Sequence, residues 1–236
     1  MITIVIPTLN AEGGLAATLA ALVPAVVEGL VREVIVVDGG STDRTLEIAD
    51  QAGVEIVKAA AGRGGQLHIG AARAKFPWLM FLHADTVLEP GWEREASVFI
   101  ERVDAGKREP AAAAFGFALD DTGVAPRLVE RFVGLRNILF RLPYGDQGLL
   151  ISKSLYGDIG GYRPLPLMED VDIVRRLKRR QMILLRPKAV TSALRYRRDG
   201  YTQRIARNQL CLLMYFLRMP YDSIARVYGR GVGREA

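Results

Sequence analysis

The stretch Ile2-Thr3-Ile4-Val5-Ile6-Pro7-Thr8-Leu9-Asn10 opens the chain with apolar and β-branched residues and then turns abruptly polar. Three further short apolar runs follow it, at Val34–Val37, Val54–Val57 and Trp78–Leu82. These runs are continuously apolar rather than alternating, which indicates strands that are covered on both faces. Helix-compatible segments separate them, at Leu15–Val27, Thr45–Ala52 and Gln66–Lys75. The alternation predicts a parallel α/β sheet over the first hundred residues.

The second half of the chain predicts a mixture of longer helices and isolated strands. The expected strands are Ala111–Leu119 and Leu149–Ser152. The expected helices are Pro126–Leu142, Glu169–Arg180 and Tyr201–Met219, the last of them stopped by Pro220. Because no repeat, low-complexity tract or linker interrupts the sequence, we expect one continuous domain over residues 1–236.

Composition favours a globular protein outside the secretory pathway. Half of the 236 residues are apolar and a quarter are charged, which is ordinary for such a domain. The single cysteine, Cys211, cannot form an intramolecular disulfide, so a reducing, cytoplasmic compartment is expected. The longest apolar run near the C-terminus, Leu210–Leu217, has eight residues, whereas a spanning helix needs about 20. We therefore expect no integral membrane segment, although the chain can lie against the inner face of a membrane.

Positive charge is concentrated in the C-terminal third. Between Val171 and Arg207 there are twelve Lys and Arg residues against two Asp residues. This surplus suggests an anionic partner such as a phosphate or a lipid headgroup, and a solvated helix face is an equally good reading. Nucleic acid is not expected, because no helix-turn-helix, zinc-finger or aromatic RNA-binding signature accompanies the charge.

Polar residues follow three of the predicted strands directly. They are the segments Pro7–Asn10, Asp38-Gly39-Gly40 and His83-Ala84-Asp85. Ligands of open α/β sheets bind at the carboxyl ends of the strands, so we expect Asp38 and Asp85 to face a cleft rather than merely to begin turns. A dinucleotide oxidoreductase would need G-x-G-x-x-G after the first strand, and that pattern is absent.

Asp170 is the strongest candidate for a reacting carboxylate. On a helix that begins near Glu169, positions 170, 173, 174 and 177 share one mostly apolar face, which predicts that Asp170 points into the molecule. Asp172 is expected on the opposite side, and Glu169 nearer the helix edge, where a carboxylate favours the dipole. A carboxylate placed in this way can take a proton from a bound substrate.

In order and spacing, four motifs resemble those of glycosyltransferase family 2. They are Ile4–Asn10, Val36–Asp43, Asp85 after a hydrophobic strand, and Glu169-Asp170. The resemblance implies a Rossmann-like GT-A fold of the α/β class, with a mostly parallel central sheet flanked by helices and a C-terminal helical extension. Residues 1–110 would bind the nucleotide-sugar, 111–200 would form the acceptor and catalytic half, and 201–236 would form the extension. It also implies inversion at the anomeric carbon and a divalent cation, Mg²⁺ or Mn²⁺.

The resemblance assigns the donor side residue by residue. The donor-binding positions it implies are Pro7, Thr8, Leu9, Asn10, Glu12, Asp38, Gly39, Arg63, Gly64, Gln66, His83, Ala84 and Asp85. Asp85 matches the metal-binding end of the family's D-x-D motif. His83 stands where the family has the first Asp of that motif, and Thr86 replaces an acid often found there. The glycine-containing loop around Arg63 is expected to approach phosphate oxygens.

The acceptor side is assigned in the same way. Asp146, Gln147 and Gly148 match an acceptor-side segment, for which a purely structural turn is an equal alternative. Arg195-Tyr196 resembles a reduced form of the family's Arg-Trp pair and is expected on a segment that closes over the diphosphate. Asp170 and Glu169 would be the catalytic pair. The motifs Leu-His-Ala-Asp-Thr and Leu-Met-Glu-Asp are similar to those of a compact bacterial subgroup linked to arsenosugar pathways.

These observations lead to one main hypothesis. We expect an inverting, metal-dependent glycosyltransferase that uses a UDP- or GDP-sugar. A membrane-peripheral enzyme that glycosylates a polyprenyl phosphate or another lipid is the chief alternative. A nucleotide-binding oxidoreductase and a non-catalytic sugar-nucleotide-binding protein are less favoured. The sequence identifies neither the acceptor nor the sugar, and it leaves a homo-oligomer open.

Overall fold

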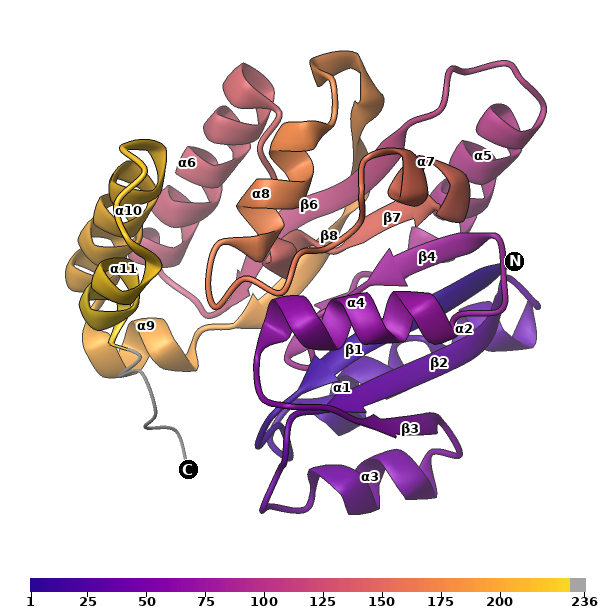
Figure 1. The fold of residues 1–236 in the computed structure, drawn as a ribbon, viewed down its shortest axis with the longest axis horizontal. Coiled ribbons are helices and arrows are strands. Elements are labelled where there is room, and N and C mark those ends of the chain that lie inside the picture. The colour runs from indigo at the N-terminus through magenta and orange to yellow at the C-terminus, as the bar shows by residue number, and fades with distance from the viewer. Residues whose placement is uncertain (230–236) are drawn as a thin grey trace.

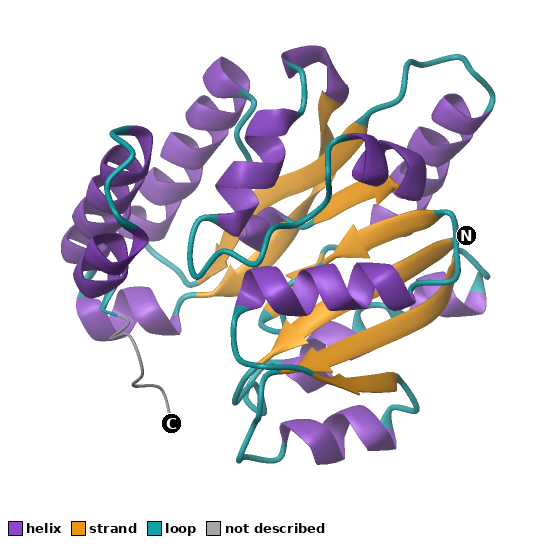
Figure 2. Ribbon diagram, viewed as in Figure 1, coloured by secondary structure: helices purple, strands orange, loops and turns teal. Residues whose placement is uncertain are grey.

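A central sheet of eight strands organises the chain in the computed structural model, which describes residues 1–229 (Figures 1 and 2). The strands are β1 Ile2–Thr8, β2 Val31–Asp38, β3 Glu55–Lys58, β4 Trp78–Phe81, β5 Thr86–Leu88, β6 Ala112–Asp120, β7 Leu149–Ser152 and β8 Met182–Ser192. Their order across the sheet is β3-β2-β1-β4-β7-β6-β8-β5.

Strand directions divide the sheet into two parts. In the first part β1 runs parallel to β2 and β4, and β2 runs parallel to β3. In the second part β6 and β8 are parallel, whereas β7 runs antiparallel to β4 and β6, and β5 runs antiparallel to β8. The four predicted N-terminal strands therefore form the parallel part, as their continuous apolar runs indicated.

Helices cover both faces of the sheet (Figure 2). They are α1 Leu15–Ala20, α2 Val23–Val27, α3 Thr45–Gln51, α4 Arg63–Arg73, α5 Trp92–Asp104, α6 Val124–Phe140, α7 Lys153–Asp158, α8 Glu169–Arg176, α9 Leu194–Asp199, α10 Tyr201–Phe216 and α11 Tyr221–Tyr228, with short 3₁₀ turns at Gly145–Gln147 (η1) and Arg179–Gln181 (η2). Within residues 1–229 no helix is long and apolar enough to cross a membrane.

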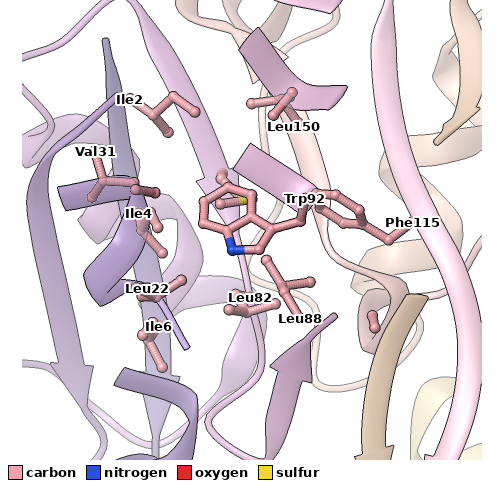
Figure 3. Packing of buried hydrophobic residues seen from close by; sticks show 14 of the residues in the cluster. Ile2, Ile4, Ile6, Leu22, Val31, Leu82, Leu88, Trp92, Phe115 and Leu150 are labelled. Atoms are coloured by element: carbon pink, nitrogen blue, oxygen red, sulfur yellow. The ribbon is translucent and has the colours of Figure 1, made fainter. Parts of the chain in front are cut away.

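The sheet separates two hydrophobic cores. Alternate residues of β1 enter opposite cores: Ile4 joins one with α1, α2 and α5, and Val5 joins the other with α4 and α8. In the first core Trp92 stands edge-on to Phe115, with ring centroids 6.2 Å apart, among aliphatic side chains from β1, β2 and β7 (Figure 3). This packing on both faces fixes the sheet rim on which the candidate site is built.

Several predicted helix boundaries were wrong. The helix expected over Leu15–Val27 is two helices, and Pro24 lies in the first turn of the second, where its missing N–H costs no helical hydrogen bond. The helix expected to reach Arg180 ends at Arg176, because Leu177 is extended and buried in the core. The last predicted helix ends at Phe216, and the left-handed conformation of Arg218 turns the chain into α11.

Two further differences concern the middle and the end of the chain. Helix α4 starts at Arg63 instead of Gln66, so the expected glycine-containing loop is the first helical turn. The sequence reading gave no strand at β8, although β8 joins β6 to β5. Residues 230–236 of the predicted C-terminal extension lie outside the described residues.

Candidate active site

A groove of about 1310 Å³ runs along the carboxyl ends of β1 and β4. The parallel register places Thr8 at the end of β1 beside Asp38 at the end of β2. Most of the predicted donor residues line this groove: Pro7, Thr8, Leu9, Asn10, Arg63, Gln66, His83, Ala84 and Asp85. The structure therefore gathers residues from three sequence segments on one wall.

Asp38 lies behind that wall, which corrects its expected position facing the cleft. It is 1% exposed, and its carboxylate accepts hydrogen bonds from the Gly40 and Ser41 N–H groups, both at 2.9 Å, and from the Thr8 hydroxyl at 3.1 Å. Burial raises the pKa of Asp38, but these bonds and one from the Ser41 hydroxyl outweigh it, so the pKa lies below its usual range. Asp38 thus holds the loop after β2 in place.

Glu12, Gly39 and Gly64, which were also expected on the donor side, are not among the residues that line the groove. The Glu12 carboxylate accepts a hydrogen bond from the Arg44 N–H at 3.1 Å, and the Gly39 N–H donates to the Thr8 carbonyl at 2.9 Å. A Cβ atom on Gly64 would lie 2.3 Å from the Arg163 carbonyl oxygen. These three residues therefore shape the loops and the packing of α4.

Gln66 connects the ends of two strands. Its Nε2 donates to the carbonyl oxygens of Thr8 at 2.8 Å and Val37 at 2.7 Å, and the residue is 3% exposed. Both amide hydrogens of Gln66 are used inside the protein. Gln66 therefore fixes the groove wall and has no further N–H to donate to a ligand.

Arg63 occupies the centre of the site. Its Nη1 lies 3.1 Å from Nε2 of His83, and its Nε forms an ion pair with Oε1 of Glu169, which is 1% exposed. Burial lowers the pKa of Arg63, but Glu169 and Asp170 more than offset this and raise it above its ordinary value. A permanently charged guanidinium thus stands between the donor groove and the residues of α8.

A cavity of about 150 Å³ adjoins the groove. Six residues line both spaces, so the two spaces share a wall; they are Arg63, His83, Asp85, Leu167, Ser192 and Arg195. Asp146, Asp170 and Tyr144 line the cavity from η1, α8 and the segment before η1. The cavity therefore brings carboxylates from separate parts of the chain to the inner end of the groove.

The Asp170 carboxylate is held by backbone groups. Its Oδ2 accepts from the Gly145 N–H at 2.9 Å, and its Oδ1 accepts from the Val171 N–H at 2.8 Å. A Cβ on Gly145 would lie 2.7 Å from Nε2 of His83, so only glycine lets the η1 turn approach this closely. The carboxylate keeps unshared electron pairs beside the cavity and a fixed orientation.

Glu169 and Asp172 correct the predicted faces of α8. Both are buried: Glu169 pairs with Arg63, and Asp172 pairs with Arg176 at 2.7 Å and with Arg163 at 3.3 Å. Met168, just before the helix, is in the left-handed conformation with φ 62°, and this turn directs the first helical residues. Glu169 consequently supports the site from inside, while Asp170 meets the cavity.

Asp146 and Gln147 lie next to each other in η1 but have different surroundings. The Asp146 Oδ1 is buried without a hydrogen-bond partner among residues 1–229, and burial, together with the charges of Asp170 and Asp85, raises the pKa of Asp146 to about 6. Gln147 is fully buried; its Nε2 donates to the Phe115 carbonyl at 2.8 Å, and its Oε1 accepts from Asn137 at 3.1 Å. The expected acceptor contact therefore fits Asp146 and does not fit Gln147.

Gly148 and the Arg195-Tyr196 pair complete the predicted set. Gly148 has φ 66° and a Cβ there would lie 3.3 Å from the Phe115 ring, so the backbone at this position favours glycine. Arg195 is exposed and Tyr196 stacks on Tyr201 with ring centroids 5.2 Å apart. Both residues belong to the short helix α9 at the cavity mouth.

Few side chains at the site can act as ligands of a metal ion. Asp85 is an exposed carboxylate at the groove, and Nε2 of His83 faces Arg63. Over the described part of the chain, no group of three or more His, Cys, Asp or Glu side chains gathers to hold a metal. Mg²⁺ is commonly held by one or two carboxylates together with substrate phosphates. Asp85 fits that mode, in which the cation arrives with a diphosphate.

Sequence reasoning missed several residues of the cavity. Ser192 comes from the end of β8, Arg204 and Asn208 from α10, and Tyr228 from α11. Arg204 is 6% exposed and donates to the Tyr228 hydroxyl at 2.9 Å. The one available signal was an arginine on the otherwise apolar side of the helix beginning at Tyr201.

Comparison with known proteins places these features in context. The family described as "Glycosyl transferase family 2" matches residues 3–107. PGL/p-HBAD biosynthesis glycosyltransferases of Mycobacterium tuberculosis and Mycobacterium bovis are 31% identical over 180 residues, covering 69% of this chain and 63% of theirs. The chain thus spans less than two thirds of the length of these curated relatives.

Two solved structures share the fold. Staphylococcus aureus TarS 1-349 in complex with UDP has a TM-score of 0.62 at 15% identity and covers 96% of this chain and 69% of that one. Glucosyl-3-phosphoglycerate synthase from Mycobacterium tuberculosis, in complex with Mn²⁺, UDP-glucose and phosphoglyceric acid, has a TM-score of 0.60 at 20% identity and covers 93% and 80%. The predicted α/β GT-A fold is confirmed.

Proposed function

We propose that this chain, which belongs to glycosyltransferase family 2, transfers one sugar from a nucleoside diphosphate donor to an acceptor hydroxyl. The observation that carries the proposal is the junction of groove and cavity. Arg63, His83 and Asp85 line both spaces, and Asp170 lies in the cavity on the acceptor side of that junction.

The groove suits a nucleotide at its outer part and a diphosphate at its inner end. Thr8, Leu9 and Asn10 offer backbone and side-chain groups along the wall, and Arg63 and Arg195 supply positive charge where the groove meets the cavity. The UDP and UDP-glucose complexes of the structural neighbours support a uridine donor, and a guanosine donor is the alternative. The anomeric carbon would then lie near Asp85, at the entrance to the cavity.

Asp170 would act as the base of an inverting displacement. The acceptor hydroxyl loses its proton to the Asp170 carboxylate as its oxygen bonds to the anomeric carbon. The bond from that carbon to the diphosphate oxygen breaks at the same time, and the electron pair leaves with the nucleoside diphosphate. The backbone hydrogen bonds from Gly145 and Val171 hold the carboxylate in one orientation for this transfer.

The chain's own cations would stabilise the leaving group. Arg63 is held in place by Glu169, and Arg195 on α9 stands at the cavity mouth. Fixed positive charges of this kind act on the charge that develops in the transition state. Asp85 would hold Mg²⁺ or Mn²⁺ together with the donor, and the bound cation supplies further charge neutralisation on the diphosphate.

A panel of nucleotide-sugars tests this function. The chain is mixed with UDP- and GDP-sugars in Mn²⁺, and binding is scored by thermal shift and turnover by release of the nucleoside diphosphate. We expect stabilisation by one nucleotide class and slow release of its diphosphate even with water as acceptor. Stabilisation by NAD and by no nucleotide-sugar would favour an oxidoreductase. Binding without release in the presence of candidate acceptors would favour a non-catalytic binding protein.

A further inference from the structure

Helix α6 exposes a continuous apolar stripe. Val124, Leu128, Phe132, Leu135, Ile138 and Leu139 are 76%, 47%, 68%, 52%, 63% and 49% exposed, in that order. At 100° per residue these positions fall within one third of the helix circumference. The opposite side is also apolar, since Val129 and Val133 pack against β6 and α10. Helix α6 therefore carries apolar side chains both on the side that packs against the fold and on its exposed side.

Helix α10 lies next to α6 at the same end of the molecule (Figure 1). Its C-terminal part and the turn that follows it add more exposed apolar side chains, namely Leu210, Leu213, Phe216, Leu217 and Met219. Isolated exposed apolar residues are ordinary, but a gathering of this extent on two neighbouring helices marks an interaction surface. We call these eleven residues the α6–α10 face.

The charges around the α6–α10 face identify its partner. Arg131 lies within the apolar stripe of α6, Arg127 borders it, and Arg218 follows Leu217; all three are exposed. Glu130, the one acidic residue of α6, forms an ion pair with Arg127 at 2.5 Å. A two-fold contact between copies of the chain would bring these arginines towards each other, whereas an anionic bilayer complements them.

We propose that the α6–α10 face docks on an anionic membrane surface, with the apolar side chains at the headgroup boundary and the arginines among lipid phosphates. Amphipathic surface helices with basic residues beside an apolar face bind membranes in this way. The acceptor cavity is close to this face, because Asn208 and Leu212 of α10 line it. The proposal goes beyond sugar transfer, which the groove and cavity could perform in solution.

Vesicle flotation tests the docking directly. We expect the chain to float with vesicles of phosphatidylcholine and phosphatidylglycerol. With vesicles of phosphatidylcholine alone, most of the chain should remain in the unbound fraction. Phe132→Asp and Ile138→Asp should each lower the bound fraction by about tenfold. Arg131→Glu should weaken binding to the anionic vesicles, because it replaces a positive charge near the lipid phosphates by a negative one.

Matched controls separate docking from misfolding. Val27→Asp changes a valine of α2 that is 81% exposed, and Arg94→Glu changes an exposed arginine of α5. Both should float like the wild type, and all variants should keep the wild-type thermal shift with UDP. Failure of the wild type to float would overturn the proposal, as would equal losses in Val27→Asp and Phe132→Asp. A dimer in solution that Phe132→Asp dissociates, without any change in flotation, would show instead an interface between copies.

Discussion

The Nη1 atom of Arg63 lies 3.1 Å from Nε2 of His83. A guanidinium has only donors, so Nε2 of His83 is the acceptor in this contact. His83 stands where a carboxylate would be expected in a D-x-D motif, and its lone pair is directed at a cation that the chain itself provides. The donor-side charge of the site is therefore shared between Arg63 and any metal held at Asp85.

Replacing His83 by aspartate should make the binding of the donor depend more on the metal and less on Arg63. The new carboxylate would stand near Asp85 and offer a second oxygen ligand, so the gain in UDP affinity on adding Mn²⁺ should exceed the wild-type gain. Isothermal titration with UDP in Mn²⁺ and in EDTA measures it. His68→Asp, at an exposed histidine of α4, is the control. An unchanged Mn²⁺ effect in His83→Asp would argue against this account of the pair.

Asp85 should matter only when a cation is present. We expect Asp85→Asn to weaken UDP binding in Mn²⁺ and to change it little in EDTA, because the carboxylate would act through the metal. Titrations of both proteins under both conditions provide the comparison. Equal weakening with and without the cation would mean that Asp85 contacts the ligand directly or supports the loop.

Glu169 should affect stability more than any exposed acid of the chain. Glu169→Gln removes the ion-pair partner of the mostly buried Arg63 guanidinium, and breaking such a pair costs about 3 kcal/mol of unfolding free energy. Glu47→Gln, at the exposed Arg44–Glu47 pair, should change stability little. Urea denaturation measures both. A Glu169→Gln protein as stable as the Glu47→Gln protein would contradict the structural role of the pair.

Much of the donor side could be predicted from the sequence for a local reason. Continuous apolar runs predict buried parallel strands, and the residues that follow such strands must meet at one rim. This reasoning placed Thr8, Asn10 and Asp85 at the rim, where they line the groove. The same reasoning could not predict strand β8, because Arg186-Pro187-Lys188 interrupts its apolar pattern. Its partner β6 also lies far away in the sequence.

Side-chain directions were harder to predict than strands. Helical periodicity gave Asp170 its inward direction but misplaced Glu169 and Asp172, because the left-handed Met168 sets the start of α8. Asp146 and Gln147 are neighbours in one 3₁₀ turn, yet the Asp146 side chain lines the cavity and the Gln147 side chain lies in the core. The local sequence gives no signal that would tell these two positions apart.

Asp146 should make stability depend on pH in the direction opposite to a salt-bridged acid. Its pKa is raised from 3.8 to about 6, so the folded chain keeps a proton that the unfolded chain has already released. Stability should fall as pH rises from about 4 to about 6, by up to about 3 kcal/mol, and then level off. Asp146→Asn should remove this loss, and thermal unfolding at pH 4 and pH 8 measures it. A variant no more stable than the wild type at pH 8 would contradict the assignment.

Asp170→Asn tests the central claim, that Asp170 is the base of a sugar transfer. The amide keeps the shape of the carboxylate but cannot take a proton from the acceptor. Two quantities decide the matter in one preparation: the rate of nucleoside diphosphate release from the donor that the panel identifies, and the affinity for UDP or GDP.

We predict that Asp170→Asn lowers the release rate by about a hundredfold to ten-thousandfold, while nucleotide affinity stays within about twofold of the wild type. The loss should appear in kcat, because the base acts on the acceptor in the transition state. Near-wild-type release by the Asp170→Asn protein would contradict the claim, and Asp146 would then be the carboxylate to test as the base.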